Sequence, residues 1–397
     1  MLAGAAVYIA LVQFLFVTTW TIYVIFLPRL LESTGLPVGW VPWILVLDQL
    51  VFMLADVATG VFVDRVQRTL GRIGPWIVGL TAVSCIAFLL LPHVVLLDGA
   101  APVLALGLIL IWTATSSALR APPWVLLGKY AARPALPWLN SLTLIGLAAG
   151  GAIAPFLGVV LKNVDPRLPF ALSSLTLLAA TAGIVHIERG LVRRPAALAT
   201  PLQVPRVLDA HHAAWMLGIL LLAAAFQTHF SLNAAAQFLR FARPAELEWL
   251  MPLFWVGFGA AMVPGSALCK RHGALPVMAV AALLGAGGAL VAAHAGSLDL
   301  LIAAQLVAGA AWGSMLVAIF SSAADLGRSG REGLALGTMF AMLALATIVR
   351  IGAVLAGVPK NAALAPVLVW VPVVLWAAGG VLIGVLAPYR MRPLAAQ

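Results

Sequence analysis

Twelve long apolar runs, separated by short polar turns, limit what this chain can fold into. Each run holds roughly 20 residues, the length that an α-helix needs to cross the hydrocarbon core of a bilayer. Strands of a membrane barrel are shorter and alternate between polar and apolar residues, so these continuous runs predict helices. We therefore expect an all-α membrane protein with spans at 5–31, 39–62, 75–92, 100–127, 138–161, 168–187, 213–239, 248–268, 275–294, 298–323, 333–357 and 364–388.

The composition agrees with a membrane protein and argues against nucleic-acid binding. Apolar residues make up 63% of the chain and charged residues 9%, whereas about a quarter of the residues of a soluble domain are charged. The net charge is +10, but most of the lysines and arginines lie in short turns on one side of the predicted membrane. By the positive-inside rule, both termini are expected in the cytoplasm and the protein in the cell (inner) membrane.

A polar stretch over 188–212 divides the apolar runs into two sets of six. It is rich in arginine and proline and reads ERGLVRRPAALATPLQVPRVLDAHH. The expected organisation is an N-terminal bundle over 1–187, a cytoplasmic linker over 188–212 and a C-terminal bundle over 213–397. We expect a monomer embedded in the lipid bilayer.

The segment DVATGVFVDRVQRTLGRIGPW, from Asp56 to Trp76, joins the second and third runs. Gly60 and Asp64 are four residues apart and share a helix face, so a neighbouring helix can approach the backbone at Gly60 closely. Asp64 and the arginines that follow it are expected at the water boundary, in a hydrated turn. We predict a conformational latch formed by Gly60, Asp64, Arg65, Arg68, Arg72 and Asp325.

Three segments resemble the major facilitator superfamily, and more narrowly its glycoside-pentoside-hexuronide branch. The 56–76 segment is similar to the loop between helices 2 and 3 of that branch. RAPPWVLL at 120–127 is similar to its segment at the end of helix 4, and DLGRSGREG at 325–333 to its acidic loop before helix 11. The resemblance implies two parallel six-helix bundles around a central substrate cavity, and symport by alternating access.

The resemblance also places functional positions, and this chain departs from them. Of the two acids on helix 2 of the family, the later matches Asp56 and the earlier falls on Phe52. The helix 4 acid falls on Arg120, and the helix 11 lysine becomes Arg350. A sodium site loses carboxylates through these changes, so a proton is the more fitting coupling ion. Arg120 either forms an ion pair with Asp56 or reaches another partner or the membrane interface.

Polar groups inside a bilayer are costly, so those within the runs form the candidate site. An unpaired arginine at the bilayer centre costs roughly 3 kcal/mol, and Arg350 lies too deep to reach the surface easily. His229, Asn233 and Gln237 are spaced i, i+4, i+8 and are expected to face the cavity. For His229, a hydrogen bond between helices and a proton-carrying role remain alternatives. The candidate substrate- or ion-binding residues are Asp48, Gln49, Asp56, Arg120, Trp124, His229, Asn233, Gln237 and Arg350.

The expected function is secondary active transport of a small organic solute. If Asp56 neutralises Arg120, Arg350 is left to pair with an anionic part of the substrate, such as a carboxylate or a phosphate. A lipid or lysolipid translocator of the same fold is one alternative, and a receptor or assembly factor without transport is another. The chain has no H-E-x-x-H, G-x-S-x-G or G-x-x-x-x-G-K motif, so we expect no enzymatic activity, cofactor or metal site.

Overall fold

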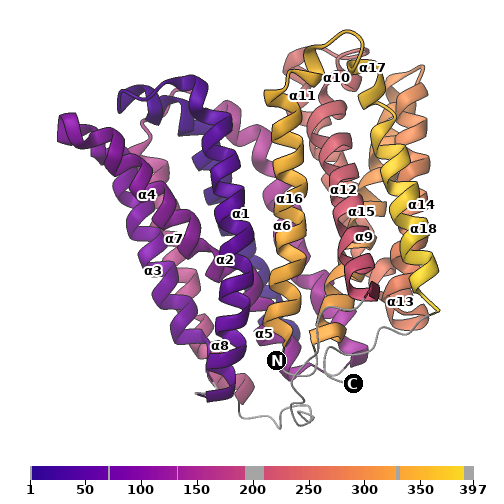
Figure 1. The fold of residues 1–397 in the computed structure, drawn as a ribbon, viewed down its shortest axis with the longest axis horizontal. Helices are drawn as coiled ribbons and strands as arrows, with labels where there is room; N and C mark the ends of the chain where they lie inside the picture. Colours follow the sequence, from indigo (N-terminus) through magenta and orange to yellow (C-terminus); the bar gives the residue numbers. More distant parts are fainter. Residues whose placement is uncertain (1, 70–71, 132, 193–209, 328–330, 389–397) are drawn as a thin grey trace.

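The computed structural model describes residues 2–69, 72–131, 133–192, 210–327 and 331–388. Within these residues, twelve helical spans are long and apolar enough to cross a membrane, which confirms the predicted class and number of spans. The first helix, α1 (Leu2–Ser33), begins at the lower side of Figure 1, and the last, α18 (Val371–Leu386), ends there. We call this lower side the termini side and the opposite one the far side.

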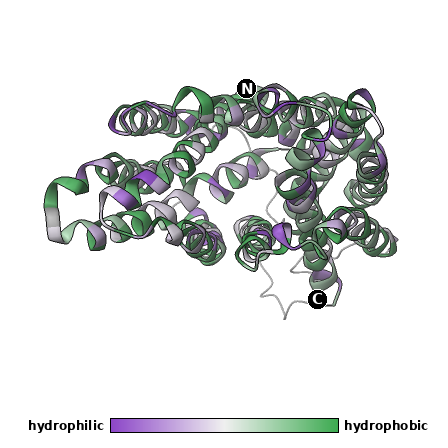
Figure 2. Cartoon of the chain, turned by 90° about the horizontal axis from the view of Figure 1, so that it is seen from above, coloured by the Kyte–Doolittle hydropathy of each residue, from purple (hydrophilic) through white to green (hydrophobic). Residues whose placement is uncertain are grey.

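The spans form two bundles of six that lie side by side (Figures 1 and 2). Besides α1, the N-terminal bundle contains α2 (Val41–Thr69), α3 (Gly74–Leu90), α4 (Ala101–Ser116), α5 (Ala121–Tyr130), α6 (Leu136–Val160), α7 (Arg167–Ala182) and α8 (Ile184–Val192). Besides α18, the C-terminal bundle contains α9 (Ala210–Phe226), α10 (Ala234–Phe238), α11 (Leu247–Leu250), α12 (Pro252–Ala260), α13 (Met262–His272), α14 (Ala274–His294), α15 (Leu298–Gly327), α16 (Glu332–Leu355) and α17 (Ala365–Leu368). α8 and α9 therefore extend into the predicted linker from its two ends, and residues 193–209 lie outside the described residues.

The fourth span is broken where its sequence carries two prolines. α4 ends at Ser116, a 3-10 turn covers Ser117–Leu119, and α5 follows. Pro123 has no N–H to donate to the carbonyl of Leu119, four residues earlier. Gln13 of α1 supplies the missing donor, because its Nε2 lies 2.6 Å from that carbonyl oxygen. The break leaves Arg120 at the junction of two helical segments.

The seventh span also departs from a regular α-helix. Residues Gln227–Asn233, between α9 and α10, form a π-helix. A π-helix closes each hydrogen bond over five residues instead of four, so the side chains that follow are rotated from the α-helical register. Sequence spacing alone therefore does not fix which side chains of this span point the same way.

On the termini side, α2 and α16 meet at a contact between glycines. A Cβ atom on Gly60 would overlap the carbonyl oxygen of Gly333, and one on Gly337 would overlap that of Asp56. Only glycine, which has no side chain, permits two helix backbones to come this close. The predicted close approach of a neighbouring helix at Gly60 is confirmed.

Asp64 belongs to the same contact, and the expectation that it lies in a hydrated turn is wrong. α2 continues to Thr69, and the Asp64 side chain is buried. Its Oδ1 accepts a hydrogen bond from the backbone N–H of Gly333 (2.7 Å), and its Oδ2 one from that of Leu334 (3.0 Å). These N–H groups lie in the first turn of α16, where they lack partners within their own helix and attract negative charge.

The remaining residues of the predicted latch lie near this contact on the termini side. Arg65 and Arg72 are exposed, as is Asp325 near the end of α15. The side chain of Arg68 lies outside the described residues. The structure therefore assigns contacts between the bundles to Gly60 and Asp64, while a latch role for the other four residues stays a prediction.

A second junction between the bundles runs along α6. Ser141 Oγ donates a hydrogen bond to the carbonyl oxygen of Met262 on α13 (2.9 Å), and Asn140 Nδ2 donates one to Ser321 Oγ on α15 (3.1 Å). Farther along α6, Gly151 makes room for the ring of Trp255 on α12. The glycine contact joins the bundles on the termini side, whereas the α6 junction continues toward the far side, where Phe156 meets the edge of Trp249 on α11.

Replacing Gly60 with Leu should drive the bundles apart on the termini side, because the new side chain overlaps the backbone of Gly333. Overpacking costs about 1–3 kcal/mol, so the population with these ends in contact should fall by roughly five- to 150-fold. Distances between spin labels at the termini-side ends of α2 and α16 measure this. Gly79→Leu on α3 is the control, since a Cβ there has no neighbour within 4 Å. Identical distance distributions for the two variants would contradict the expectation.

Candidate functional site

A central cavity of about 530 Å³ lies between the two bundles. Its α1 lining extends from Gln13 to Val24 and its α2 lining from Leu45 to Phe52. In both helices these are the middle and the half nearer the far side, so the cavity lies beyond the glycine contact. Ten of its lining residues are aromatic: Phe16, Trp20, Phe52, Trp124, Phe226, Phe230, Trp255, Trp312, Phe320 and Phe340.

The charged side chains on the cavity wall are both arginines. Arg120 comes from the break in the fourth span and Arg350 from α16, so each bundle provides one. Among the described lining residues there is no aspartate or glutamate. The other polar groups are neutral: Gln13, Gln49, Thr143, Gln227, Ser231 and Thr347.

Arg120 forms an ion pair with Asp56, one of the two alternatives that the sequence left open for this arginine. Its Nε lies 3.0 Å from Oδ2 of Asp56, a carboxylate with no exposed surface. The two atoms are not aligned as in a hydrogen bond, so the attraction is mainly one of charge. The guanidinium carbon also lies 4.6 Å from the ring centre of Phe52 and 5.0 Å from that of Phe340, which is on α16. Arg120 thus contacts both bundles.

Aromatic rings close the cavity on the termini side. Trp124 of α5 stacks on Phe320 of α15, with ring centres 3.9 Å apart, and Phe320 meets the edge of Phe340. Together with Phe52, these rings form what we call the aromatic floor. It contains side chains from both bundles, so it can persist only while the bundles touch on this side.

Arg350 differs from Arg120 because none of the described acids pairs with it. Its Nε is buried and has no hydrogen-bond partner among the described residues. Thr347, one turn earlier on α16, accepts a hydrogen bond from Gln227 Nε2 instead (2.8 Å). A buried charge without an opposite charge is strongly unfavourable. A ligand that supplies negative charge would therefore be bound most favourably at this point of the wall.

The other predicted residues of the N-terminal bundle separate into two groups. Gln49 and Trp124 line the cavity. Asp48 does not, because it lies inside the bundle with no exposed surface. Its Oδ2 accepts a hydrogen bond from the hydroxyl of Tyr23 and its Oδ1 one from that of Thr113, both at 2.8 Å.

The prediction that the polar stripe of the seventh span faces the cavity is wrong. His229 Nε2 lies 3.0 Å from Gln305 Oε1, and Gln305 in turn donates a hydrogen bond to Gln237 (3.3 Å). Asn233 donates to the carbonyl of Leu368 (2.8 Å). These bonds pair most of the polar atoms of the stripe inside the C-terminal bundle, where unpaired ones are costly, while His229 Nδ1 is buried without a partner among the described residues.

Gln227 and Ser231 line the cavity in place of the stripe. They are four residues apart, and Ser231 Oγ donates a hydrogen bond to Gln227 Oε1 (3.2 Å). The four-residue spacing of Gln227 and Ser231 was the sequence pattern that could have indicated their position on the cavity wall. This pattern was no stronger than the spacing of His229, Asn233 and Gln237, and the π-helical segment makes spacing an unreliable guide in this span.

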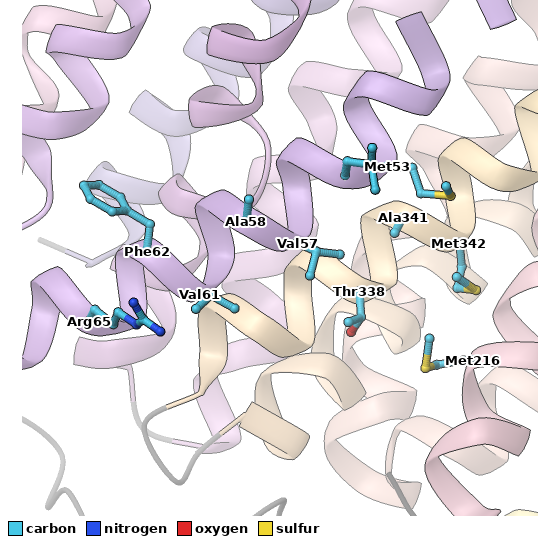
Figure 3. Close-up of a pocket in the computed structure, with 11 residues that line it drawn as sticks. Met53, Val57, Ala58, Val61, Phe62, Arg65, Met216, Thr338, Ala341 and Met342 are labelled. Carbon is cyan, nitrogen blue, oxygen red and sulfur yellow. The ribbon is translucent and has the colours of Figure 1, made fainter. Parts of the chain in front are cut away.

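A second hollow, of about 630 Å³, lies outside the bundle junction, along α2, α16 and α9 (Figure 3). Its wall is almost wholly apolar and includes Met53, Met216 and Met342. Arg65 and Thr338 are its polar side chains. This lateral groove has too few converging polar groups to orient a small polar solute, and the central cavity is the better candidate site.

Comparison with solved structures places the chain in a known fold. No protein-family model and no curated protein sequence matches it. A bacterial homologue of the iron transporter ferroportin, in its outward-facing state, aligns with a TM-score of 0.74 at 15% identity, over 97% of this chain and 100% of that one. The human organic anion transporter MFSD10 aligns with a TM-score of 0.73 at 16% identity, over 96% and 99%.

A third match is the major facilitator superfamily transporter FucP in its outward conformation. It has a TM-score of 0.65 at 17% identity and covers 98% of this chain and 99% of that one. At such identities these likenesses show the fold alone. The chain has the major facilitator fold, an all-α membrane architecture of two six-helix bundles. The resemblance to one branch of that superfamily stays a prediction.

Removing one partner of the Asp56–Arg120 pair should destabilise the protein, because the other is left as a buried, uncompensated charge. Asp56→Asn or Arg120→Gln alone should lower the free energy of unfolding by about 3 kcal/mol. The double variant should lose less than the sum of the two single losses. Thermal unfolding of the purified protein measures all three variants, and strictly additive losses would show that the two residues do not interact.

Proposed function

We propose that this protein is a secondary transporter that carries an organic anion with a substantial apolar body, by alternating access of the central cavity. The observation that supports this most directly is the cavity wall. Among the described residues it presents an arginine without an acidic partner, no acid, and ten aromatic side chains. A neutral sugar would leave the charge of Arg350 uncompensated.

The substrate class follows from what each part of the wall can bind. The planar guanidinium of Arg350 suits a carboxylate or a phosphate, to which it can donate two parallel hydrogen bonds. The rings of Trp20, Trp255 and Trp312 offer apolar surface for the rest of the molecule. The similar fold of a human organic anion transporter is compatible with this substrate class.

Alternating access requires that the closed side can open. On the termini side, the glycine contact, the Asp64 hydrogen bonds and the aromatic floor all join the two bundles. We propose that these contacts break together when the bundles rock. If the basic turns place the termini in the cytoplasm, the structure is an outward-facing state of a cell-membrane protein, the state named for two of the similar structures.

A proton is the proposed coupling ion, in preference to sodium. Sodium is a small hard cation and needs several oxygen ligands. Here Asp56 is neutralised by Arg120, and Asp48 is surrounded by the N-terminal bundle. A proton requires only one titratable group. FucP, of similar fold, is described as a fucose:proton symporter.

The lateral groove is the observation that favours the alternative function, translocation of a lipid or lysolipid. It is apolar and bordered by Arg65, which can contact an anionic head group. Uptake of a fluorescent lysolipid into reconstituted vesicles tests this alternative directly. Movement of the lysolipid that survives Arg350→Gln but is lost in Met342→Glu would favour the groove over the cavity.

Thermal unfolding in the presence of a panel of aromatic and aliphatic carboxylates and phosphates should identify the substrate class, because a ligand selective for the folded protein raises its melting temperature. Arg350→Gln should weaken binding of the best anion by roughly ten- to a hundredfold, as expected for loss of a charged hydrogen bond. Arg29→Gln is the control. It removes an exposed arginine that bonds the Val164 carbonyl, away from the cavity.

Uptake under an imposed pH or sodium gradient completes this test. An inward proton gradient should drive accumulation of the anion, and a sodium gradient should not. Strictly sodium-dependent uptake of a neutral sugar would refute the proposal, and so would unchanged uptake by Arg350→Gln.

A further inference from the structure

Asp48 is a carboxyl group enclosed in the N-terminal bundle, and the anion site does not use it. The hydroxyls of Tyr23 on α1 and Thr113 on α4 each donate to one of its oxygens. In the described part of the structure these are its only polar contacts, and it forms no ion pair there. Of the groups facing it, only Tyr23 is titratable, and none of the described ones is a cation.

A wall of aromatic rings stands between Asp48 and the cavity. Trp20 stacks on Trp112, with ring centres 5.5 Å apart, and also touches Tyr23 and Phe52. Trp20 and Phe52 face the cavity, whereas Trp112 and Tyr23 are fully buried. The neighbouring residue Gln49 lines the cavity. Asp48 therefore lies directly behind the solute-facing wall without being part of it.

This setting suits a group that gains and loses a proton as its access to water changes. An ionised carboxylate in an apolar interior is costly unless a cation compensates it, and two hydroxyl donors offset only part of that cost. A neutral carboxyl group fits the same place with little penalty. Tyr23 and Thr113 can accept as well as donate hydrogen bonds, so both protonation states find partners.

The other titratable candidates are already engaged. Asp56 holds the guanidinium of Arg120, and losing its charge would strand that arginine. His229 is bonded to Gln305 inside the C-terminal bundle and does not reach the cavity. Among the described acids of the second span, Asp48 alone is near the cavity and has neither a cation nor a helix terminus to neutralise it.

We propose that Asp48 is the binding site of the coupling proton. The aromatic rings of Trp20, Tyr23, Phe52 and Trp112 separate this site from the anion in the cavity. A proton from the solution on the far side adds to an oxygen of the Asp48 carboxylate, and the same proton leaves to the termini side after the bundles rock. This inference rests on the proposed anion transport and names its proton site.

The charges explain why the two ligands would travel together. With both bound, the anion balances Arg350 and the proton balances Asp48. With neither bound, Arg350 and Asp48 bear opposite charges, so the net charge of the two sites is again zero, although no contact joins them. A protein holding only one of the two carries a net charge in a region of low dielectric, and closing the cavity around it is unfavourable.

Infrared difference spectroscopy of the purified protein, between neutral and alkaline pH, tests the site without any substrate, because exposed carboxyl groups are already ionised over that range. A protonated-carboxyl C=O band should be present in the natural sequence and lost in Asp48→Asn. It should remain in Asp299→Asn, which neutralises an exposed acid at the start of α15. A band that persists in Asp48→Asn overturns the proposal.

Transport by reconstituted vesicles tests coupling. In Asp48→Asn, proton-driven accumulation of the anion should fall at least tenfold, and anion-for-anion exchange, which moves no net proton, should fall much less. Tyr23→Phe removes one donor to the carboxylate, so half-maximal uptake should move to higher pH. Proton-driven accumulation that survives Asp48→Asn overturns the site but leaves the proposed function standing. A band assigned to Asp48 in a protein that moves no anion retains the proton site and refutes the proposed substrate.

Discussion

The close crossing of α2 and α16 at Gly60 and Gly333 determines much of the remaining arrangement. It brings the first turn of α16 within hydrogen-bond reach of Asp64. One turn farther along α16, Gly337 lies on the backbone of Asp56, and one turn beyond that, Phe340 covers Arg120. Because these positions share one face of each helix, separating the glycines would disturb the helix cap, the surroundings of the ion pair and the floor at the same time.

Two carboxylates on the termini side bind helix N-termini in the same way but join different parts of the protein. Glu188 of α8 accepts hydrogen bonds from the backbone N–H groups of Ile73 and Gly74 at the start of α3, within one bundle. Asp64 makes the equivalent bonds across the bundles. The Glu188 hydrogen bonds persist when the bundles separate, so they stabilise the N-terminal bundle itself. The Asp64 hydrogen bonds break on separation, so they affect the balance between conformations.

Sequence patterns predicted the spans and the close approach at Gly60, and they left the Asp56–Arg120 contact as one of two alternatives, because hydropathy, glycine and buried charge each have strong, local physical requirements. They were wrong where the outcome depended on distant partners. Asp64 is buried because the start of α16 needs an acceptor, and His229 points away from the cavity because Gln305 offers it a hydrogen bond. Both partners lie far away in the chain, and neither the π-helical register nor the identity of a partner helix can be read from spacing.

The presence of one uncompensated arginine on the cavity wall and one acid behind it has an electrical consequence. If a singly charged anion and a proton fill these sites together, the loaded protein and the empty protein bear the same charge. Moving one elementary charge across a membrane costs or yields about 2.3 kcal/mol per 100 mV, but here neither half of the cycle would move any. The membrane voltage would then neither drive nor oppose transport, and accumulation would be limited by the difference in pH alone.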